Sequence, residues 1–125
     1  MREDKTILYL DDNADHRDLL KFLFEDASYK ILTCSTVNEC LVFLAEHEVS
    51  AIVMDYWLDG VENLETGEKI KELYPNIPFF YFTGDAQTKS RERALSVGAQ
   101  AYFLKPDDID GIVPAISRLL DNSAR

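Results

Sequence analysis

Cysteine, glycine and proline are scarce in this sequence, and long apolar runs are absent. Two cysteines, five glycines and four prolines occur in 125 residues, with no linker, repeat or low-complexity tract. Cys34 and Cys40 lie in segments that we expect to be buried and lack metal-ligand spacing, so we interpret them as reduced core thiols. No apolar run approaches the roughly 20 residues that span a bilayer, and the start, MREDKT, is too charged for a secretory signal. These absences predict a cytoplasmic protein that does not use a membrane.

Positive charge is also scarce. The chain has 13 Lys and Arg against 23 Asp and Glu, a net charge of −10. Such a field repels the phosphates of nucleic acids and anionic lipids, so we expect no nucleic-acid or membrane partner. The length leaves room for one domain, residues 1–125 with a core at about 5–121, and 46% hydrophobic residues suffice for its core.

Strand-like and helix-like segments alternate along the chain. The pattern predicts strands at 5–10, 30–35, 50–55, 77–84 and 101–104, and helices at 13–27, 36–47, 66–74, 86–97 and 107–120. Five βα units predict an α/β fold, a doubly wound five-stranded parallel sheet with helices on both faces. Residues 55–65 read as a polar loop, and Gly98 is placed to cap the fourth helix. Pro114 falls inside the last helix, so we expect a loose first turn or a start near Ile112.

Polar residues of interest follow four of the five predicted strands. Asp11 and Asp12 end the first strand, Asp55 the third and Thr83 the fourth, and Lys105 follows the fifth. In an open α/β sheet, ligands bind outside these carboxyl ends. Three neighbouring carboxylates repel one another unless a cation neutralises them, and Mg²⁺ suits such oxygen ligands. With a hydroxyl and a lysine beside them, they describe a place for a phosphoryl group.

Each of these residues also has a simpler interpretation. Asp12 or Asn13 is a natural N-cap for the first helix. Asp55 taken alone is a turn residue, Thr83 a strand-end hydroxyl and Lys105 a solvated charge. The joint arrangement at successive strand ends favours a site over these separate interpretations.

The chain resembles the receiver domain of bacterial two-component response regulators. The resemblance rests on LDDN after the first strand, VMD ending the third, FTG ending the fourth, and GAQAYFLKP around the fifth. It runs from about Lys5 to Leu120 and implies the flavodoxin-like (βα)5 receiver fold.

The resemblance implies a role for each acidic residue. Asp55 is expected to be the phosphoacceptor, taking a phosphoryl group from a sensor histidine kinase or a histidine phosphotransfer protein. Asp12 and Asp55 would bind Mg²⁺ directly, with the backbone carbonyl of Trp57 as a third ligand. Asp11 would bind the ion mainly through water.

The remaining family residues concern the switch. Lys105 would pair with the phosphoryl oxygens, and its bond to Pro106 would be cis. Thr83 and Tyr102 match the switch pair: the hydroxyl would turn toward the phosphoryl group and the ring would move inward. That would remodel the face made by the fourth helix, fifth strand and fifth helix for a downstream protein partner. An ordinary aromatic residue at a strand edge is the alternative for Tyr102.

Two features depart from the usual receiver pattern. The loop after Asp55 is roughly four residues longer, with the comparable glycine at Gly67. Trp57 is bulkier than is usual at its position, and Asp85 adds a negative charge. We hypothesise that Trp57 and Asp85 tune the lifetime of the phosphorylated state.

Other candidates have ordinary interpretations. His16 on the first helix and His47 after the second are interpreted as solvated or capping residues. Lys89, Arg91 and Arg93 on the fourth helix are interpreted as a solvated face rather than a nucleic-acid patch.

The sequence therefore predicts a signalling phosphoacceptor that catalyses only its own phosphorylation and dephosphorylation. We expect a receiver without an output domain, which docks to a partner or relays the phosphoryl group. The alternative is a phosphorylation-independent interaction module on the same fold. An aspartate-nucleophile phosphatase is disfavoured, because it would need a second acid two residues after the first, whereas here adjacent acids are followed by Asn13. A flavin carrier is disfavoured, because no glycine- or Ser/Thr-rich phosphate loop follows the first strand. The kinase, the target, the phosphoryl lifetime, phosphorylation-dependent dimerisation and membership of a longer protein stay open.

Overall fold

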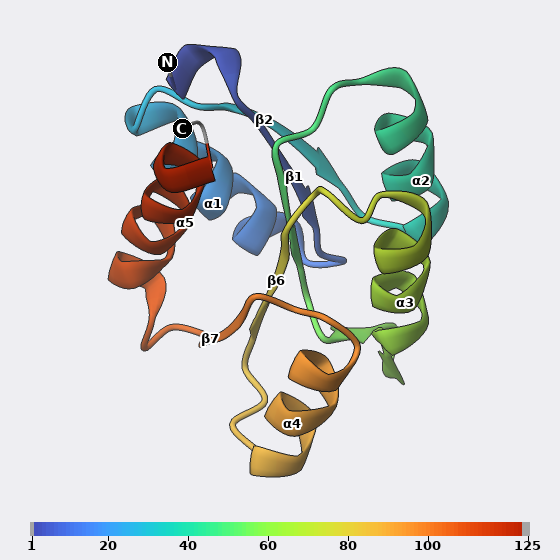
Figure 1. Cartoon of the computed structure of the whole chain (residues 1–125). Helices are drawn as coiled ribbons and strands as arrows, with labels where there is room; N and C mark the ends of the chain where they lie inside the picture. Colours follow the sequence, from blue (N-terminus) through green and yellow to red (C-terminus); the bar gives the residue numbers. More distant parts are fainter. Residues whose placement is uncertain (1, 124–125) are drawn as a thin grey trace.

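Five parallel strands form the central sheet of the computed structural model, which describes residues 2–123 (Figure 1). The strands are β1 (Thr6–Leu10), β2 (Lys30–Cys34), β3 (Ala51–Met54), β6 (Phe79–Thr83) and β7 (Ala101–Leu104). Their order across the sheet is β2-β1-β3-β6-β7, and every neighbouring pair is parallel. The order reverses between β1 and β3, which is where ligands bind in doubly wound sheets. The predicted fold class is confirmed.

Helices cover both faces of the sheet. They are α1 (Ala14–Asp26), α2 (Val37–Glu46), α3 (Leu64–Leu73), α4 (Thr88–Ser96) and α5 (Ile109–Ser123); a short 3-10 helix, η1 (Arg2–Asp4), precedes β1. Helices α1 and α5 lie on one face, and α2, α3 and α4 lie on the other (Figure 1). Within residues 2–123, none of the helices combines the length and the apolar character that crossing a membrane requires.

The alternation of side chains along β1 explains this layering. Leu8 and Leu10 pack in the cluster that includes Leu44 of α2. Ile7 and Tyr9 pack in the other cluster, with residues of α1 and α5. Because successive side chains of a strand point to opposite faces, a strand with no polar face needs helices on both sides. Cys34 and Cys40 are buried and free, as the sequence predicted.

The residues that cap the helices determine which polar side chains are left to form the site. Asn13 is the N-cap of α1, and its side chain accepts a hydrogen bond of 3.0 Å from the His16 amide. Asp12 is therefore not used as the cap. Gly98 follows α4 with φ of 110°, a conformation that glycine adopts without strain, and its amide donates to the Leu95 carbonyl.

The starts of α5 and α3 differ from the sequence prediction. Helix α5 begins at Ile109, so the expected start near Ile112 is wrong and Pro114 lies within the helix. The hydrogen bond that Pro114 cannot donate would go to the carbonyl of Asp110 in the first turn. Asp110 is exposed, so water can replace that bond. Helix α3 begins at Leu64 rather than near Thr66.

The predicted polar loop after β3 contains a β-hairpin. Strands β4 (Trp57–Leu58) and β5 (Val61–Glu62) pair in antiparallel fashion. Asp59 and Gly60 connect them with φ of 50° and 77°, and positive φ at both central residues is typical of a type I′ turn. The Asp-Gly pair between apolar residues was therefore a hairpin signal that the loop interpretation missed.

Candidate functional site

The strand ends bring the acidic residues together. The Asp55 amide donates to the Leu10 carbonyl at 2.9 Å, which places the end of β3 beside the end of β1. Carboxylate oxygens of Asp11, Asp12 and Asp55 all lie within 4.8 Å of one another. This is the grouping that the sequence predicted.

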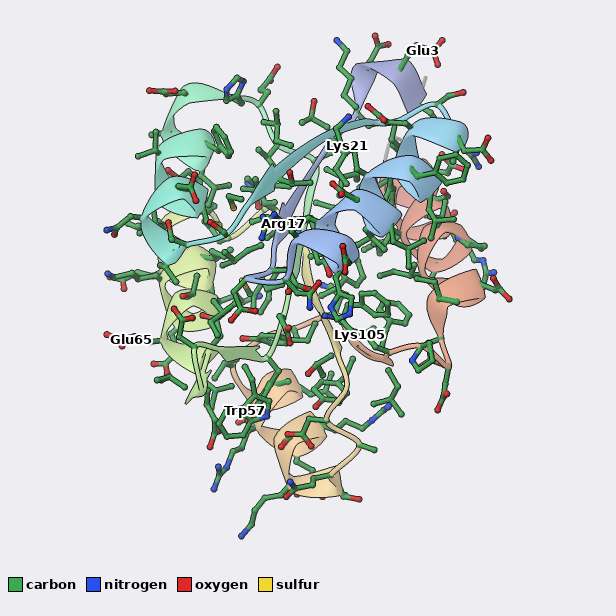
Figure 2. The ribbon with its side chains drawn as sticks, turned by 180° about the vertical axis from the view of Figure 1, so that it is seen from behind. Glu3, Arg17, Lys21, Trp57, Glu65 and Lys105 are labelled. Atoms are coloured by element: carbon green, nitrogen blue, oxygen red, sulfur yellow. The ribbon has the colours of Figure 1, made fainter. Side chains whose placement is uncertain are left out.

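Lys105 lies between two of these carboxylates. Its Nζ is 2.5 Å from Oδ2 of Asp11 and 3.2 Å from Oδ2 of Asp55. The Lys105 amide also donates to the Thr83 carbonyl at 2.8 Å, which places Lys105 beside the end of β6. In Figure 2, Lys105 lies below the first turns of α1 and Trp57 lies further out, near α4. We call Asp11, Asp55 and Lys105 the floor of the site.

Asp11 is fully buried and heavily hydrogen-bonded. Its Oδ1 accepts from the Asn13 amide at 2.9 Å, and its Oδ2 accepts from the Tyr9 hydroxyl as well as from Lys105. Burial opposes ionisation of Asp11, but the hydrogen bonds from Lys105, Tyr9 and Asn13 outweigh it and hold the pKa of Asp11 below its usual range. Asp11 is thus ionised at neutral pH and pairs with the Lys105 ammonium.

Tyr9 is a site residue that the sequence interpretation missed. Burial, with the negative charge of Asp11 beside its hydroxyl, raises the pKa of Tyr9, so it remains a neutral donor. The signal was present, because residues i and i+2 of a strand share a face and Tyr9 precedes Asp11 by two.

Asp55 has the opposite electrostatic character. Burial raises the pKa of Asp55, Lys105 counteracts the rise, and the charge of Asp11 adds to it. Its Oδ1 accepts from the Trp57 amide at 3.3 Å. A further cation beside Asp55 would favour its charged form, which is the form that binds metals and attacks phosphorus.

An open pocket of about 820 Å³ lies above the floor. Its lining residues include His16, Asp55, Trp57, Thr83, Asp85 and Lys105. Thr83 is buried, and its Oγ1 accepts from the Asp85 amide at 3.3 Å. The pocket therefore gathers the expected phosphoacceptor, the hydroxyl and the lysine in one space.

The β4–β5 hairpin forms one side of this pocket and reaches toward α4. Nε1 of Trp57 donates to Oδ2 of Asp85 at 2.8 Å, and Oγ of Ser90 donates to the same oxygen at 2.6 Å. Burial alone would raise the pKa of Asp85, but hydrogen bonds from Ser90, Trp57 and the Gln87 amide lower it.

Three further contacts hold the hairpin. Glu62 accepts from the Tyr56 hydroxyl at 2.7 Å and pairs with Arg93 of α4 at 3.0 Å. The Asp59 amide donates to Oδ2 of Asp12 at 3.0 Å. We call Trp57, Glu62, Asp85 and Arg93 the rim of the site.

Tyr102 lies inward in this structure. Its side chain is buried, and its hydroxyl donates to the Asp85 carbonyl at 2.6 Å. The ring lies edge-on to Tyr56, with centroids 5.9 Å apart. The Tyr102 ring thus already has, in this structure, the inward position that the resemblance associates with phosphorylation. The Lys105–Pro106 peptide bond is cis.

Among the residues with ordinary interpretations, His16 differs from expectation. Its Nδ1 lies 2.9 Å from Nζ of Lys105, a contact that the solvated or capping interpretation missed. The spacing from Asp11 carries no signal for this contact, because it depends on how α1 packs over the sheet. His47, Lys89 and Arg91 are exposed, as the sequence predicted.

The fold and the site define a flavodoxin-like α/β domain with an acidic pocket at the switch point of its sheet. The family model of the response regulator receiver domain matches residues 7–117, and the chain belongs to this family. Its members are receiver domains of two-component signalling, and they act as signalling phosphoacceptors rather than classic enzymes.

Relatives and solved structures agree with this assignment. A response regulator of Rickettsia bellii described as NtrX-like is 31% identical over 114 residues, which cover 90% of this chain and 24% of that protein. A CheY-like receiver domain protein of Methanospirillum hungatei has a TM-score of 0.86 at 28% identity, covering 94% of each chain. Response regulator TrrA of Thermotoga maritima, in complex with Mg²⁺ and BeF, has a TM-score of 0.81 at 23% identity, covering 92% of this chain and 98% of that one. The chain spans about a quarter of the length of its NtrX-like relatives.

Proposed function

We propose that this receiver domain accepts a phosphoryl group on Asp55 from a histidine kinase or a histidine phosphotransfer protein. The observation that carries the proposal is the placement of Lys105 between the carboxylates of Asp11 and Asp55 at the switch point of the sheet. A cation there can meet a phosphoryl group on Asp55 without leaving the site.

The acidic residues fit the Mg²⁺ that this chemistry uses. Asp11, Asp12 and Asp55 offer hard oxygen ligands close together. Burial and the charge of Asp11 raise the pKa of Asp55, so a bound cation would favour the charged carboxylate that metals need. The Trp57 backbone carbonyl would complete the protein ligands. When bound, Mg²⁺ supplies positive charge that offsets the charge on the phosphoryl oxygens. The Mg²⁺ and BeF complex of TrrA supports the assignment by analogy.

The chain's own residues account for the transfer step. An ionised Oδ of Asp55 attacks phosphorus, an O–P bond forms, and the P–N bond of the donor phosphohistidine breaks. The leaving imidazole keeps the electron pair of that bond. Lys105 lies 3.2 Å from Oδ2 of Asp55, so its ammonium can bond a phosphoryl oxygen after a small shift.

The readout would use Thr83 and Tyr102. A phosphoryl group on Asp55 shares a pocket with the Thr83 hydroxyl, and Thr83 already contacts the Asp85 amide. Tyr102 bonds the carbonyl of the same Asp85. A movement of the Asp85 segment would therefore reach both residues and the face of α4, β7 and α5, where a downstream partner would bind.

Intact mass after incubation with Mg²⁺ and a small-molecule phosphodonor tests the proposal. We expect one added phosphoryl group that disappears in Asp55→Asn and when the metal is removed. Asp59→Asn, at the hairpin turn, is the matched control and should still be modified. If neither the small-molecule donor nor histidine kinases modified the wild-type protein, the result would favour the phosphorylation-independent interaction module.

A further inference from the structure

The ammonium group of Lys105 meets three acceptors. They are Oδ2 of Asp11 at 2.5 Å, Oδ2 of Asp55 at 3.2 Å and Nδ1 of His16 at 2.9 Å. A lysine ammonium has three N–H donors and no acceptor. All three donors of Lys105 are thus used, one of them by a residue outside the predicted site.

The chemistry of Lys105 sets the direction of this contact. Because an ammonium can only donate, Nδ1 of His16 is the acceptor in the hydrogen bond with Lys105. Nδ1 is also 3.6 Å from Oδ2 of Asp11, so the imidazole nitrogen lies beside the ammonium and the buried carboxylate together.

The first turn of α1 holds His16 in this place. The His16 amide donates to Oδ1 of Asn13 at 3.0 Å, and the Asn13 amide donates to Oδ1 of Asp11 at 2.9 Å. Asp11 in turn binds Lys105, which binds His16. These four residues close a ring of hydrogen bonds, so the imidazole is fixed relative to the carboxylate that Lys105 also binds.

We propose that His16 is a positioning residue that holds the ammonium of Lys105 in place for the phosphoryl group. This rests on the proposed function. In this structure one N–H of the Lys105 ammonium bonds the Asp55 carboxylate. When a phosphoryl group is added to Asp55, that N–H can turn to a phosphoryl oxygen. Asp11 and His16 retain the other two and keep Nζ in position. Without His16, Asp11 alone would hold the ammonium, which would then move more freely into the open pocket.

Two variants separate this role from packing. His16→Asn places an oxygen on the carbon that carries Nδ1 in histidine, so it preserves an acceptor near Lys105. His16→Ala removes the acceptor, and alanine is favourable at a partly exposed helix position. His47→Ala, at an exposed histidine that ends α2, is the matched control.

The first measurement asks how rigidly the Lys105 ammonium is held. It uses ¹⁵N NMR on protein without phosphodonor. The Lys105 signal is assigned by its absence in Lys105→Arg. We expect a slowly exchanging ammonium signal in wild type, His16→Asn and His47→Ala, and its loss in His16→Ala. An unchanged signal in His16→Ala would overturn the proposal.

The rate constant of phosphorylation by phosphoramidate at saturating Mg²⁺ is the second measurement. We expect about a tenfold decrease in His16→Ala, roughly the effect of one hydrogen bond to a charged group, with His16→Asn within about threefold of wild type. A decrease in His16→Asn as large as in His16→Ala would show that the ring itself matters and would also overturn the proposal. A wild-type protein that takes no phosphoryl group would contradict the proposed function, whereas the NMR signal would still decide whether His16 orders Lys105.

Discussion

The floor and the rim of the site both hold charged side chains at hydrogen-bonding distance, but solvent reaches them to different degrees. In the floor, the side chains of Asp11, Lys105 and Asp55 are 0%, 11% and 14% exposed. In the rim, Arg93 and Glu62 are 49% and 30% exposed. Breaking a buried pair leaves an uncompensated charge, whereas water replaces an exposed partner. The same type of contact should therefore have large effects in the floor and small ones in the rim.

The two regions also differ in origin. The floor residues end or follow strands of the parallel sheet, so the core that aligns those strands also positions them. The rim depends on the hairpin after β3, on the segment that precedes α4, and on α4 itself. We therefore expect the floor to determine whether phosphorylation occurs and the rim to adjust how long it lasts.

The largest effect is expected for Lys105→Met, which removes the positive charge between two buried carboxylates. We expect the phosphorylation rate to fall by about a hundredfold or more, the typical result of losing one preorganised electrostatic contact. The free energy of unfolding should fall by about 3 kcal/mol, because Asp11 and Asp55 then repel without compensation. Mass spectrometry and urea unfolding measure the two effects. Lys89→Met, at an exposed lysine of α4, is the control, and an equal loss there would contradict the distinction between floor and surface.

Asp11→Asn and Asp55→Asn should have opposite effects on stability in metal-free buffer. The folded-state pKa of Asp11 is lowered, so its charge stabilises the fold above the unfolded pKa of about 3.9 and loses that effect as pH falls. The pKa of Asp55 is raised, so its charge costs stability above its folded pKa and costs nothing below about 3.9.

At pH 7, Asp11→Asn should therefore lower the free energy of unfolding by about 2 kcal/mol, and Asp55→Asn should raise it. Both differences from wild type should shrink toward pH 3. Urea unfolding across this pH range measures them. If both variants changed the free energy of unfolding in the same direction at pH 7, the opposite roles of the two carboxylates would be contradicted.

A smaller effect is expected for Trp57→Phe, which removes the indole donor to Asp85 and keeps an aromatic ring. If the Trp57–Asp85 hydrogen bond shields the phosphoryl group, dephosphorylation should accelerate by roughly two- to fivefold, as expected for a hydrogen bond worth about 0.5–1 kcal/mol. Asp85→Asn should act in the same direction, and the double variant should add little. Loss of the added phosphoryl mass over time gives the rates. Fully multiplicative effects in the double variant would show that the two side chains act separately.

The smallest effect is expected for Arg93→Gln, which removes an exposed partner of Glu62. Salt screens such pairs, so the small stability loss relative to wild type should shrink further between low and high ionic strength. Thermal unfolding at two salt concentrations measures it. A large loss of stability that salt does not change would show that the Arg93–Glu62 pair behaves like the buried pairs of the floor.

Much of the fold was predictable because its signals are local. Unbroken apolar runs such as AIVM in β3 fit strands covered on both faces, and helical spacing of leucines fits α1. The grouping of Asp11, Asp55 and Lys105 was also predictable, because the carboxyl ends of parallel strands meet at one edge. The hairpin had a local signal in Asp59-Gly60, which the loop interpretation did not use.

The sequence by itself determined the order of strands and helices. It also determined that carboxylates, a hydroxyl and a lysine stand at the strand ends. Both follow because the hydrophobic period and the strand boundaries are properties of short segments. Only the tertiary structure decided which partners meet. Trp57 contacts Asp85 across 28 residues of sequence. His16 contacts Lys105 for the same reason. Such pairs depend on how helices and the hairpin pack around the sheet, and residue spacing along the chain does not contain that information.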